Sequence, residues 1–494
     1  MWVEIKRILR HSFVYGLAIL LTNIMSLILL PVYMSYLEPD EIGLLEIINR
    51  TSDILRIILM VGLTVTILRF SQESDDEIHK KTVISTALLF LAFFSCLILG
   101  MLMIFAGQVN RLMFACGEHT GYIRIMLITL FFEVIYIVPI LYFQARLQST
   151  IYILLSVIRF TAGVSLIIYF VAYKQMGIMG VLYGNLMHIG LLGSILFIWM
   201  IVKVGIRFDR KLLRSMLKFG LPFVPGSIFL FILNSGDRYL LINMTSAEKL
   251  GVYAIGYRIG SIAVALVISP FMRVWSASYV KYSQKSNRDY IFGNILTYVI
   301  FVYTQCSLAV ILFRHELLVL LGDVVYWEAA DIVPYIALAY LFWAGSLILD
   351  SGFYITKKTG YKPILLGIAA AIAIGLCLLL IPYFGYYGAL YATVISFLCY
   401  FVISLVILRK IYPIMYQWGR LLKIVLAALM ILGANELLIS EKSILAMIAP
   451  GWKEWYFCMV WKGFLLILLP VLLFLGNFFT REEKDKFRQF LGIT

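Results

Sequence analysis

The chain has 494 residues, of which 62% are hydrophobic and only 14% are charged, and its mean hydropathy is +0.96. A soluble chain carries roughly 25% charged residues, so this composition excludes a soluble enzyme. The net charge of +14 fits basic loops on one side of a membrane, and no nucleic-acid partner is expected. The six cysteines lack CxxC or metal-ligand spacing, so neither a disulfide framework nor a metal site is predicted.

Long apolar runs follow one another along the whole chain. The run over 13–37 contains no charged residue and exceeds the ~20 residues that a helix needs to cross the hydrocarbon core. Lipid cannot hydrogen-bond a bare backbone, so such runs must be helices. The sequence predicts an all-α polytopic membrane protein with about 14 transmembrane helices, at approximately 12–37, 42–70, 82–106, 120–143, 151–173, 178–202, 217–244, 251–275, 290–313, 332–356, 362–382, 385–409, 420–439 and 459–479.

The loop charges predict the orientation of these spans. With the N-terminus inside, 28 Lys and Arg residues fall in cytoplasmic segments and seven in outer segments. This bias follows the positive-inside rule. Adding or removing one span would move every later loop to the other side of the membrane and destroy this bias. The charges therefore favour 14 spans with both termini cytoplasmic.

An internal repeat is predicted around two glycines. The segment LEPDEIGLLEIINR around Gly43 resembles TSAEKLGVYAIGYR around Gly251, and this alignment superposes Arg50 on Arg258. Six spans return the chain to the same side, so two parallel repeats with a cavity between them are expected. The predicted domains are an N-lobe (1–202), a cytoplasmic linker (203–216), a C-lobe (217–410), and two extra C-terminal helices with a cytoplasmic tail (411–494).

Charged side chains interrupt span 2, although each costs roughly 2.5–3.5 kcal/mol at the bilayer centre. Glu46, Asn49, Arg50, Asp53 and Arg56 fall within an arc of about 120° on one helical face. Two interpretations remain open. The stripe is either the wall of a polar cavity or a set of ion pairs that hold span 2 to its neighbours.

Later spans contain further polar groups. Asp237 of span 7 and Arg258 of span 8 lie at similar depth and could pair, which would leave Arg238 unpaired. Glu133 of span 4 and Arg159 of span 5 also lie at similar depth and are expected to form a structural pair.

Four acids are candidates for coupling an ion, or serve only as counter-charges for arginines. They are Asp53, Glu133, Asp237 and Asp350. All six cations within the spans are arginines, which stay charged when desolvated and bind phosphate with a planar fork. The predicted substrate-binding residues are Arg50, Arg56, Arg238, Arg258, Asn49 and Asn234. We expect Arg50 and Arg258 to face each other across the cavity and to bind an anionic head group such as a pyrophosphate. No catalytic residue or cofactor is predicted.

Two stretches resemble bacterial polysaccharide-export flippases of the MOP exporter superfamily, the O-antigen and capsule translocases. They are NSGDRYLLINMTSAEKLGVYAIGYRIGSI (234–262) and LPVYMSYLEPDEIGLLEIINRTSDIL (30–55). The resemblance implies two six-helix lobes in a V plus two extra helices. It also implies a non-enzymatic transporter of the bacterial inner membrane. Its cargo would be an undecaprenyl-diphosphate-linked oligosaccharide, moved to the outer leaflet by alternating access, and its partners the glycosyltransferases and polymerase of the same pathway.

Three alternatives stay open. MATE multidrug or cation antiporters commonly place a coupling acid in span 1, and the peptidoglycan lipid II flippase carries arginines there. Span 1 of this chain has Asn23 among uncharged neighbours. A membrane glycan polymerase usually has a large outer loop, whereas the longest outer loops here, 314–331 and 440–458, are short.

Overall fold

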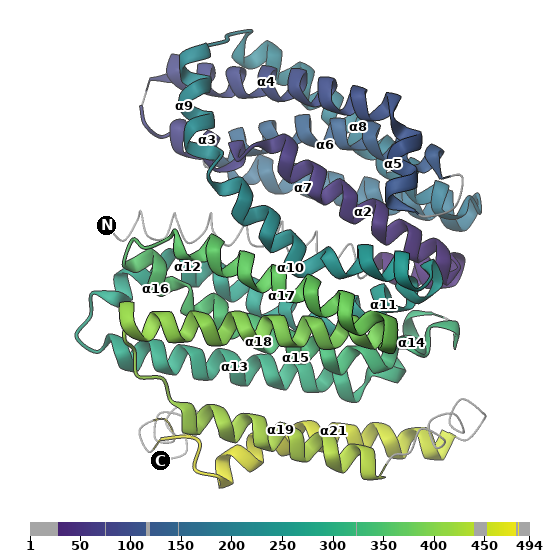
Figure 1. The fold of residues 1–494 in the computed structure, drawn as a ribbon, viewed down its shortest axis with the longest axis vertical. Coiled ribbons are helices and arrows are strands. Elements are labelled where there is room, and N and C mark those ends of the chain that lie inside the picture. The colour runs from purple at the N-terminus through teal and green to yellow at the C-terminus, as the bar shows by residue number, and fades with distance from the viewer. Residues whose placement is uncertain are drawn as a thin grey trace. The chain divides into compact units, whose positions relative to one another are not determined.

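The computed structural model describes residues 28–480 and Glu483, apart from residues 75, 115–118, 147, 323 and 439–451. Within these residues all regular elements are helical, which confirms the predicted all-α class (Figure 1). Most of the span predicted over 12–37, with Asn23, lies outside the described residues.

The chain forms two compact units. The first comprises residues 1–256, 318–329 and 359–400, and the second comprises residues 257–317, 330–358 and 401–494. The predicted lobes, linker and C-terminal appendage stay a prediction.

The first unit contains a bundle in which α6 packs against α4, α7 and α8 (Figure 1). In the same unit, α10 packs against both α2 and α17. The helices of this unit are α2 (Pro39–Met60), α3 (Leu63–Phe70), α4 (Glu77–Ile104), α5 (Ala106–Met113), α6 (Thr120–Ala145), α7 (Ser149–Ile168), η1 (Tyr169–Tyr173), α8 (Gly177–Val204), α9 (Arg210–Gly220), α10 (Phe223–Met244), η3 (Val324–Tyr326) and α17 (Tyr361–Phe384). Most of α11 (Ala247–Gly260) and α18 (Tyr386–Ile411) also belongs to it.

The second unit has an apolar core built by α13, α15, α19 and α21, with Leu296, Ile348, Ile424 and Leu465 fully buried. The predicted spans 13 and 14 correspond to α19 and α21, which pack against each other and against α13. The helices of this unit are η2 (Val264–Ile268), α12 (Ser269–Ser283), α13 (Arg288–Leu312), α15 (Ala329–Leu349), α16 (Ser351–Ile355), α19 (Trp418–Leu438) and α21 (Trp452–Leu475), with the beginning of α14 (Arg314–Leu321).

The helices are long and apolar enough for a multi-pass membrane protein. Eleven of the described helices could each cross a bilayer, and the number is 13 if each of two bent pairs counts as one span. The predicted number of 14 is therefore approximate, because the first span lies mostly outside the described residues.

Spans 2 and 7 are each broken into two helices, which the sequence did not predict. The bend is 43° between α2 and α3, and 44° between α9 and α10. Val61 and Gly62 both adopt left-handed backbone angles, with φ of 45° and 77°, and Pro222 lacks the backbone N–H that a continuous helix needs. A Cβ on Gly62 would lie 2.2 Å from the carbonyl oxygen of Gly220. The two breaks therefore meet through bare backbone.

Part of the predicted linker 203–216 is helical. α9 begins at Arg210, and the Asp209 side chain caps it by accepting hydrogen bonds from the N–H groups of Lys211 (2.8 Å) and Leu212 (3.0 Å). An acidic N-cap satisfies N–H groups that have no partner within the helix. The cap thus explains why a helix begins inside a basic loop.

Candidate substrate-binding site

Eight charged side chains of the first unit form one continuous series of ion pairs. Acids and arginines alternate along it, in the order Asp237, Arg238, Glu46, Arg50, Asp53, Arg56, Glu133, Arg159. We call this series the charge ladder. It joins α10, α2, α6 and α7, and its formal charges cancel. The polar stripe predicted on span 2 therefore forms ion pairs, both within α2 and with neighbouring helices.

The centre of the ladder lies on one face of α2. Arg50 lies four residues after Glu46 and three before Asp53, which places the three side chains together on an α-helix. The Arg50 Nε atom is 3.0 Å from Glu46 Oε1, and its Nη1 atom is 2.9 Å from Asp53 Oδ2. The other oxygen of Asp53 pairs with Arg56. Asp53 thus bridges two guanidinium groups of its own helix.

Glu133 connects α2 to α7. Its Oε2 atom is 3.1 Å from Arg56 Nη1, and its Oε1 atom is 3.4 Å from Arg159 Nη2. This geometry confirms the predicted pair between Glu133 and Arg159 and adds Arg56 as a partner. The guanidinium of Arg159 also lies 5.0 Å from the ring centre of Tyr136, within cation–π range.

The other end of the ladder lies on α10. Arg238 Nη1 is 2.7 Å from Asp237 Oδ1, and Arg238 Nε is 3.4 Å from Glu46 Oε1. The prediction that Arg238 would be unpaired is wrong, because the packing of α2 on α10 brings Glu46 beside it. The second oxygen of Asp237 accepts a hydrogen bond from the Tyr253 hydroxyl, so Asp237 is engaged by both Arg238 and Tyr253.

Burial divides the ladder into two parts. The side chains of Glu46, Asp237 and Arg238 are only 4–8% exposed. Those of Arg50, Asp53 and Arg56 are 29–35% exposed, and Arg159 (37%) and Glu133 (20%) resemble them. The buried part carries one net negative charge, and the exposed part carries one net positive charge. Only the exposed part can be reached from outside the protein.

The remaining predicted site residues lie outside the ladder. Arg258 is half-buried in the last turn of α11, and Asp350 is buried just before α16; both belong to the second unit. Asn49 is half-buried on α2. The Asn234 side chain donates to the carbonyl oxygen of Leu230 (2.8 Å), and the backbone carbonyl oxygen of Asn234 accepts a hydrogen bond from Arg238. The expectation that Arg50 and Arg258 face each other stays a prediction.

A polar contact beside the ladder was not predicted from the sequence. The hydroxyl oxygens of Thr51 on α2 and Tyr239 on α10 are 3.0 Å apart. No spacing signal distinguishes these two hydroxyls among 31 tyrosines. The contact adds a second polar link between the helices that Glu46 and Arg238 already join.

The two glycines of the predicted repeat lie against each other. A Cβ on Gly43 would lie 1.9 Å from the carbonyl oxygen of Ala247, and a Cβ on Gly251 would lie 1.8 Å from that of Pro39. Each carbonyl belongs to the residue four positions before the opposite glycine, so the contact is reciprocal. α2 and α11 therefore cross with their backbones touching, and no side chain fits between them.

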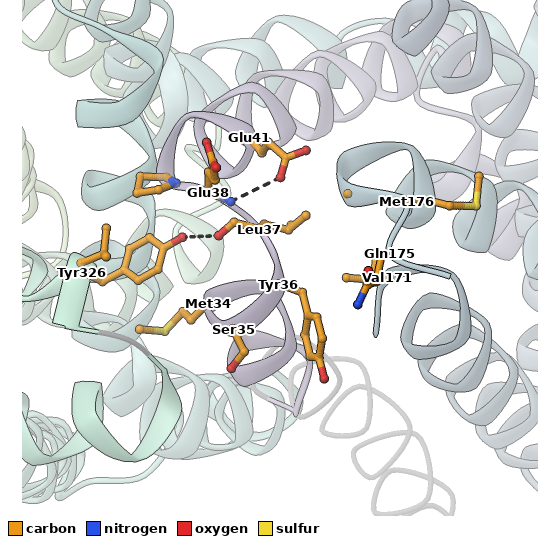
Figure 2. A pocket seen from close by; sticks show the side chains of 13 residues that line it. Met34, Ser35, Tyr36, Leu37, Glu38, Glu41, Val171, Gln175, Met176 and Tyr326 are labelled. Atoms are coloured by element: carbon orange, nitrogen blue, oxygen red, sulfur yellow. Dashed lines mark hydrogen bonds between the residues drawn. The ribbon is translucent and has the colours of Figure 1, made fainter. Parts of the chain in front are cut away.

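A cavity of about 1000 Å³ lies beside the beginnings of α2 and α8 (Figure 2). At its wall, the Glu41 carboxylate accepts hydrogen bonds from the N–H groups of Glu38 (3.3 Å) and Ile178 (3.2 Å). The Tyr326 hydroxyl donates to the carbonyl oxygen of Leu37 (2.7 Å). These contacts give Glu41 and Tyr326 structural roles in fixing the loop before α2.

A family comparison agrees with this architecture. Residues 8–276 match the model of the polysaccharide biosynthesis protein family. The chain belongs to this family. No curated protein sequence matches the chain significantly.

Solved structures of transporters share the fold. The lipid II flippase MurJ in an inward closed conformation aligns with a TM-score of 0.74 and 13% identity, over 95% of this chain and 99% of that one. An inward-facing MATE multidrug resistance transporter of the MOP superfamily aligns with a TM-score of 0.67 and 16% identity, over 80% of this chain and 97% of that one. A MOP superfamily transporter from Pyrococcus furiosus aligns with a TM-score of 0.58 and 18% identity, over 82% of this chain and 95% of that one. At these identities the likeness establishes the fold alone.

Proposed function

We propose that this polysaccharide biosynthesis protein is a flippase. Its cargo is an oligosaccharide unit of a surface glycan, such as O-antigen or capsule, linked to undecaprenyl diphosphate, and it moves this cargo from the cytoplasmic to the outer leaflet of the bacterial inner membrane. The observation that carries the proposal is the exposed part of the charge ladder, where Arg50 and Arg56 hold one carboxylate between them. Paired guanidinium groups bind phosphate oxygens in the same way as carboxylate oxygens.

The exposed part of the ladder needs a polar surrounding. Arg50 and Arg56 are about a third exposed on a helix that forms part of a membrane span. Contact of either side chain with hydrocarbon would cost roughly 2.5–3.5 kcal/mol. We therefore propose that this face of α2 lines a water-filled cavity, which accommodates the diphosphate and the sugars.

The net charge of the exposed part favours an anion. Arg50, Arg56 and Arg159 outnumber the carboxylates of Asp53 and Glu133. A cation antiporter needs the opposite balance, so this feature supports glycan-lipid transport over multidrug transport. Lipid II is also linked to a polyprenyl diphosphate, so the arginines alone do not distinguish it from the proposed cargo. Transport of lipid II and of the proposed oligosaccharide lipid, measured side by side, distinguishes the two.

Burial assigns different roles to the predicted binding residues. We propose that Arg50, Arg56, Arg258 and Asn49 face the cargo. Arg238 is only 4% exposed and Asn234 bonds within its own helix, so both hold α10 in place.

The experiment measures translocation directly. Proteoliposomes containing the purified protein receive a fluorescent undecaprenyl-diphosphate oligosaccharide, and an impermeant glycosidase reports its arrival at the outer leaflet. We expect Arg50→Ala and Arg56→Ala to lose at least ~10-fold in rate, since each removes a charge-assisted contact of about 1.5–3 kcal/mol. Arg111→Ala, at an exposed position on α5, is the control. Unchanged rates in both variants would refute the proposal.

A further inference from the structure

The Asp53 carboxylate lies between the guanidinium groups of Arg50 and Arg56. We propose that Asp53 is a resident counter-anion of the diphosphate site, and that cargo binding displaces it and adds one proton to it. The inference rests on the proposed function and deepens it, because it names the residue that couples cargo binding to protons.

The geometry of Asp53 resembles that of a bound anion. One carboxylate oxygen is 2.9 Å from Arg50 Nη1, and the other pairs with Arg56. Each arginine has a second acid as partner: Glu46 at 3.0 Å from Arg50, and Glu133 at 3.1 Å from Arg56. When Asp53 leaves, both guanidinium groups therefore stay anchored and oriented. The site is preorganised for another anion with two oxygens at similar spacing.

Asp53 is the acid of the ladder that can leave most easily. Both of its ladder partners lie on its own helix, α2. Glu46 joins α2 to α10, and Glu133 joins α2 to α7. Asp237 is 8% exposed and joins α10 to Tyr253 on α11. Displacement of Asp53 breaks no contact between helices, whereas displacement of any other ladder acid breaks at least one.

Charge balance requires a proton when the cargo binds. The groups that face Asp53 are Arg50, Arg56 and Glu46 on α2, Glu133 on α6 and Tyr239 on α10. A diphosphate diester brings two negative charges to a site with one net positive charge. An ionised Asp53 beside it would face like charges at contact distance, which disfavours the ionised form. The Asp53 carboxylate therefore takes one proton from a buffer acid in the surrounding solution, which becomes its conjugate base, and no covalent bond of the cargo is made or broken.

The test uses a soluble diphosphate diester, UDP-glucose, and calorimetry on the purified full-length protein. Such a diester lacks the second ionisation near pH ~6 of a phosphomonoester, so its own charge stays constant from about pH 6 to 8. For the wild type we expect affinity to rise as the pH falls, by up to ~10-fold per pH unit, with proton uptake visible in buffers of different ionisation enthalpy. Asp53→Asn should bind about 10-fold tighter at pH 7.5, with no pH dependence.

Two control variants accompany the measurement. Asp40→Asn removes an exposed acid in the first turn of α2 and should behave as the wild type. Asp53→Glu keeps the carboxylate and should retain the pH dependence, which separates displacement from a change in folding. If Asp53→Asn does not fold, the number of protons that the wild type takes up on binding UDP-glucose is the test. A value of zero overturns the inference.

The outcomes distinguish this inference from the proposed function. Equal binding by wild type and Asp53→Asn, without proton uptake, overturns the role of Asp53 and leaves the arginine site intact. Weaker binding by Asp53→Asn also overturns it. Absence of binding in both proteins refutes the anion site itself, and with it the proposed function.

Discussion

The Glu46 carboxylate of α2 meets the guanidinium of Arg238 on α10, at 3.4 Å, and both side chains are only 4% exposed. The two residues are 192 positions apart, and their pair links the early and later helices of the first unit. Burial of this kind makes a charge strongly dependent on its partner, because water is not available to replace it.

Glu46→Gln is therefore expected to destabilise the protein by about 3 kcal/mol, since it leaves the buried guanidinium of Arg238 with less counter-charge. The measurement is thermal unfolding of the purified protein in detergent. The control is Glu73→Gln, because Glu73 and Arg69 form a pair that is about half exposed. Its loss should change stability by less than ~1 kcal/mol. Equal effects of the two variants would contradict the structural role of Glu46.

Gly43→Ala should slow transport and lower stability, because the added methyl group would lie 1.9 Å from the carbonyl oxygen of Ala247. Gly251→Ala should have the same effect, since the contact is reciprocal. At a position without neighbours the same substitution stabilises a helix by up to ~1 kcal/mol. Gly100 on α4 has no atom within 4 Å of such a methyl group, so Gly100→Ala is the matched control. Thermal unfolding should therefore show a loss of stability for Gly43→Ala and Gly251→Ala but not for Gly100→Ala. Equal effects of the three substitutions would contradict the close crossing of α2 and α11.

Lowering the pH should reduce the free energy of unfolding, and His315 is the group responsible. Burial, with the nearby charges of Arg314 and Lys462, lowers the pKa of His315 to about 3 from 6.5. The unfolded chain therefore binds a proton near pH 6.5, whereas the folded chain does not. The stability that neutral His315 contributes is complete above pH 6.5 and is lost as the pH falls toward 3. By pH 5 the loss should be up to about 2 kcal/mol.

His315→Gln removes this titration. Its thermal unfolding temperature should change less between pH 7 and pH 5 than that of the wild type. His79→Gln, in the partly exposed beginning of α4, serves as the comparison and should follow the wild type. A parallel decline in all three proteins would assign the acid sensitivity to other groups.

The sequence predicted the features that depend on periodicity within a helix or on depth in the membrane. Apolar length gave the helical class and most spans, and equal depth gave the pair of Glu133 and Arg159. The pair of Glu46 and Arg238 could not be predicted in this way, since it depends on which helices pack together. The sequence placed Glu46 in the polar stripe but assigned it no partner.

The break after α2 was missed for a different reason. Val61 adopts a φ of 45°, a conformation that β-branched residues rarely accept, so a valine at this position gives no signal of a left-handed backbone. The break after α9 had a visible signal in Pro222. Hydropathy averaged over a whole span does not register such a residue, because its neighbours remain apolar.

The order of charges on α2 also bears on how the chain enters the bilayer during synthesis. Two of its acids and its two arginines alternate within eleven residues, from Glu46 to Arg56, and pair with one another. This helix leaves the ribosome long before α6, α7 and α10 can offer partners. Because the formal charges of this eleven-residue stretch already neutralise one another, the translocon receives a segment that behaves as less polar than its composition, and the later helices add their contacts to ion pairs that already exist.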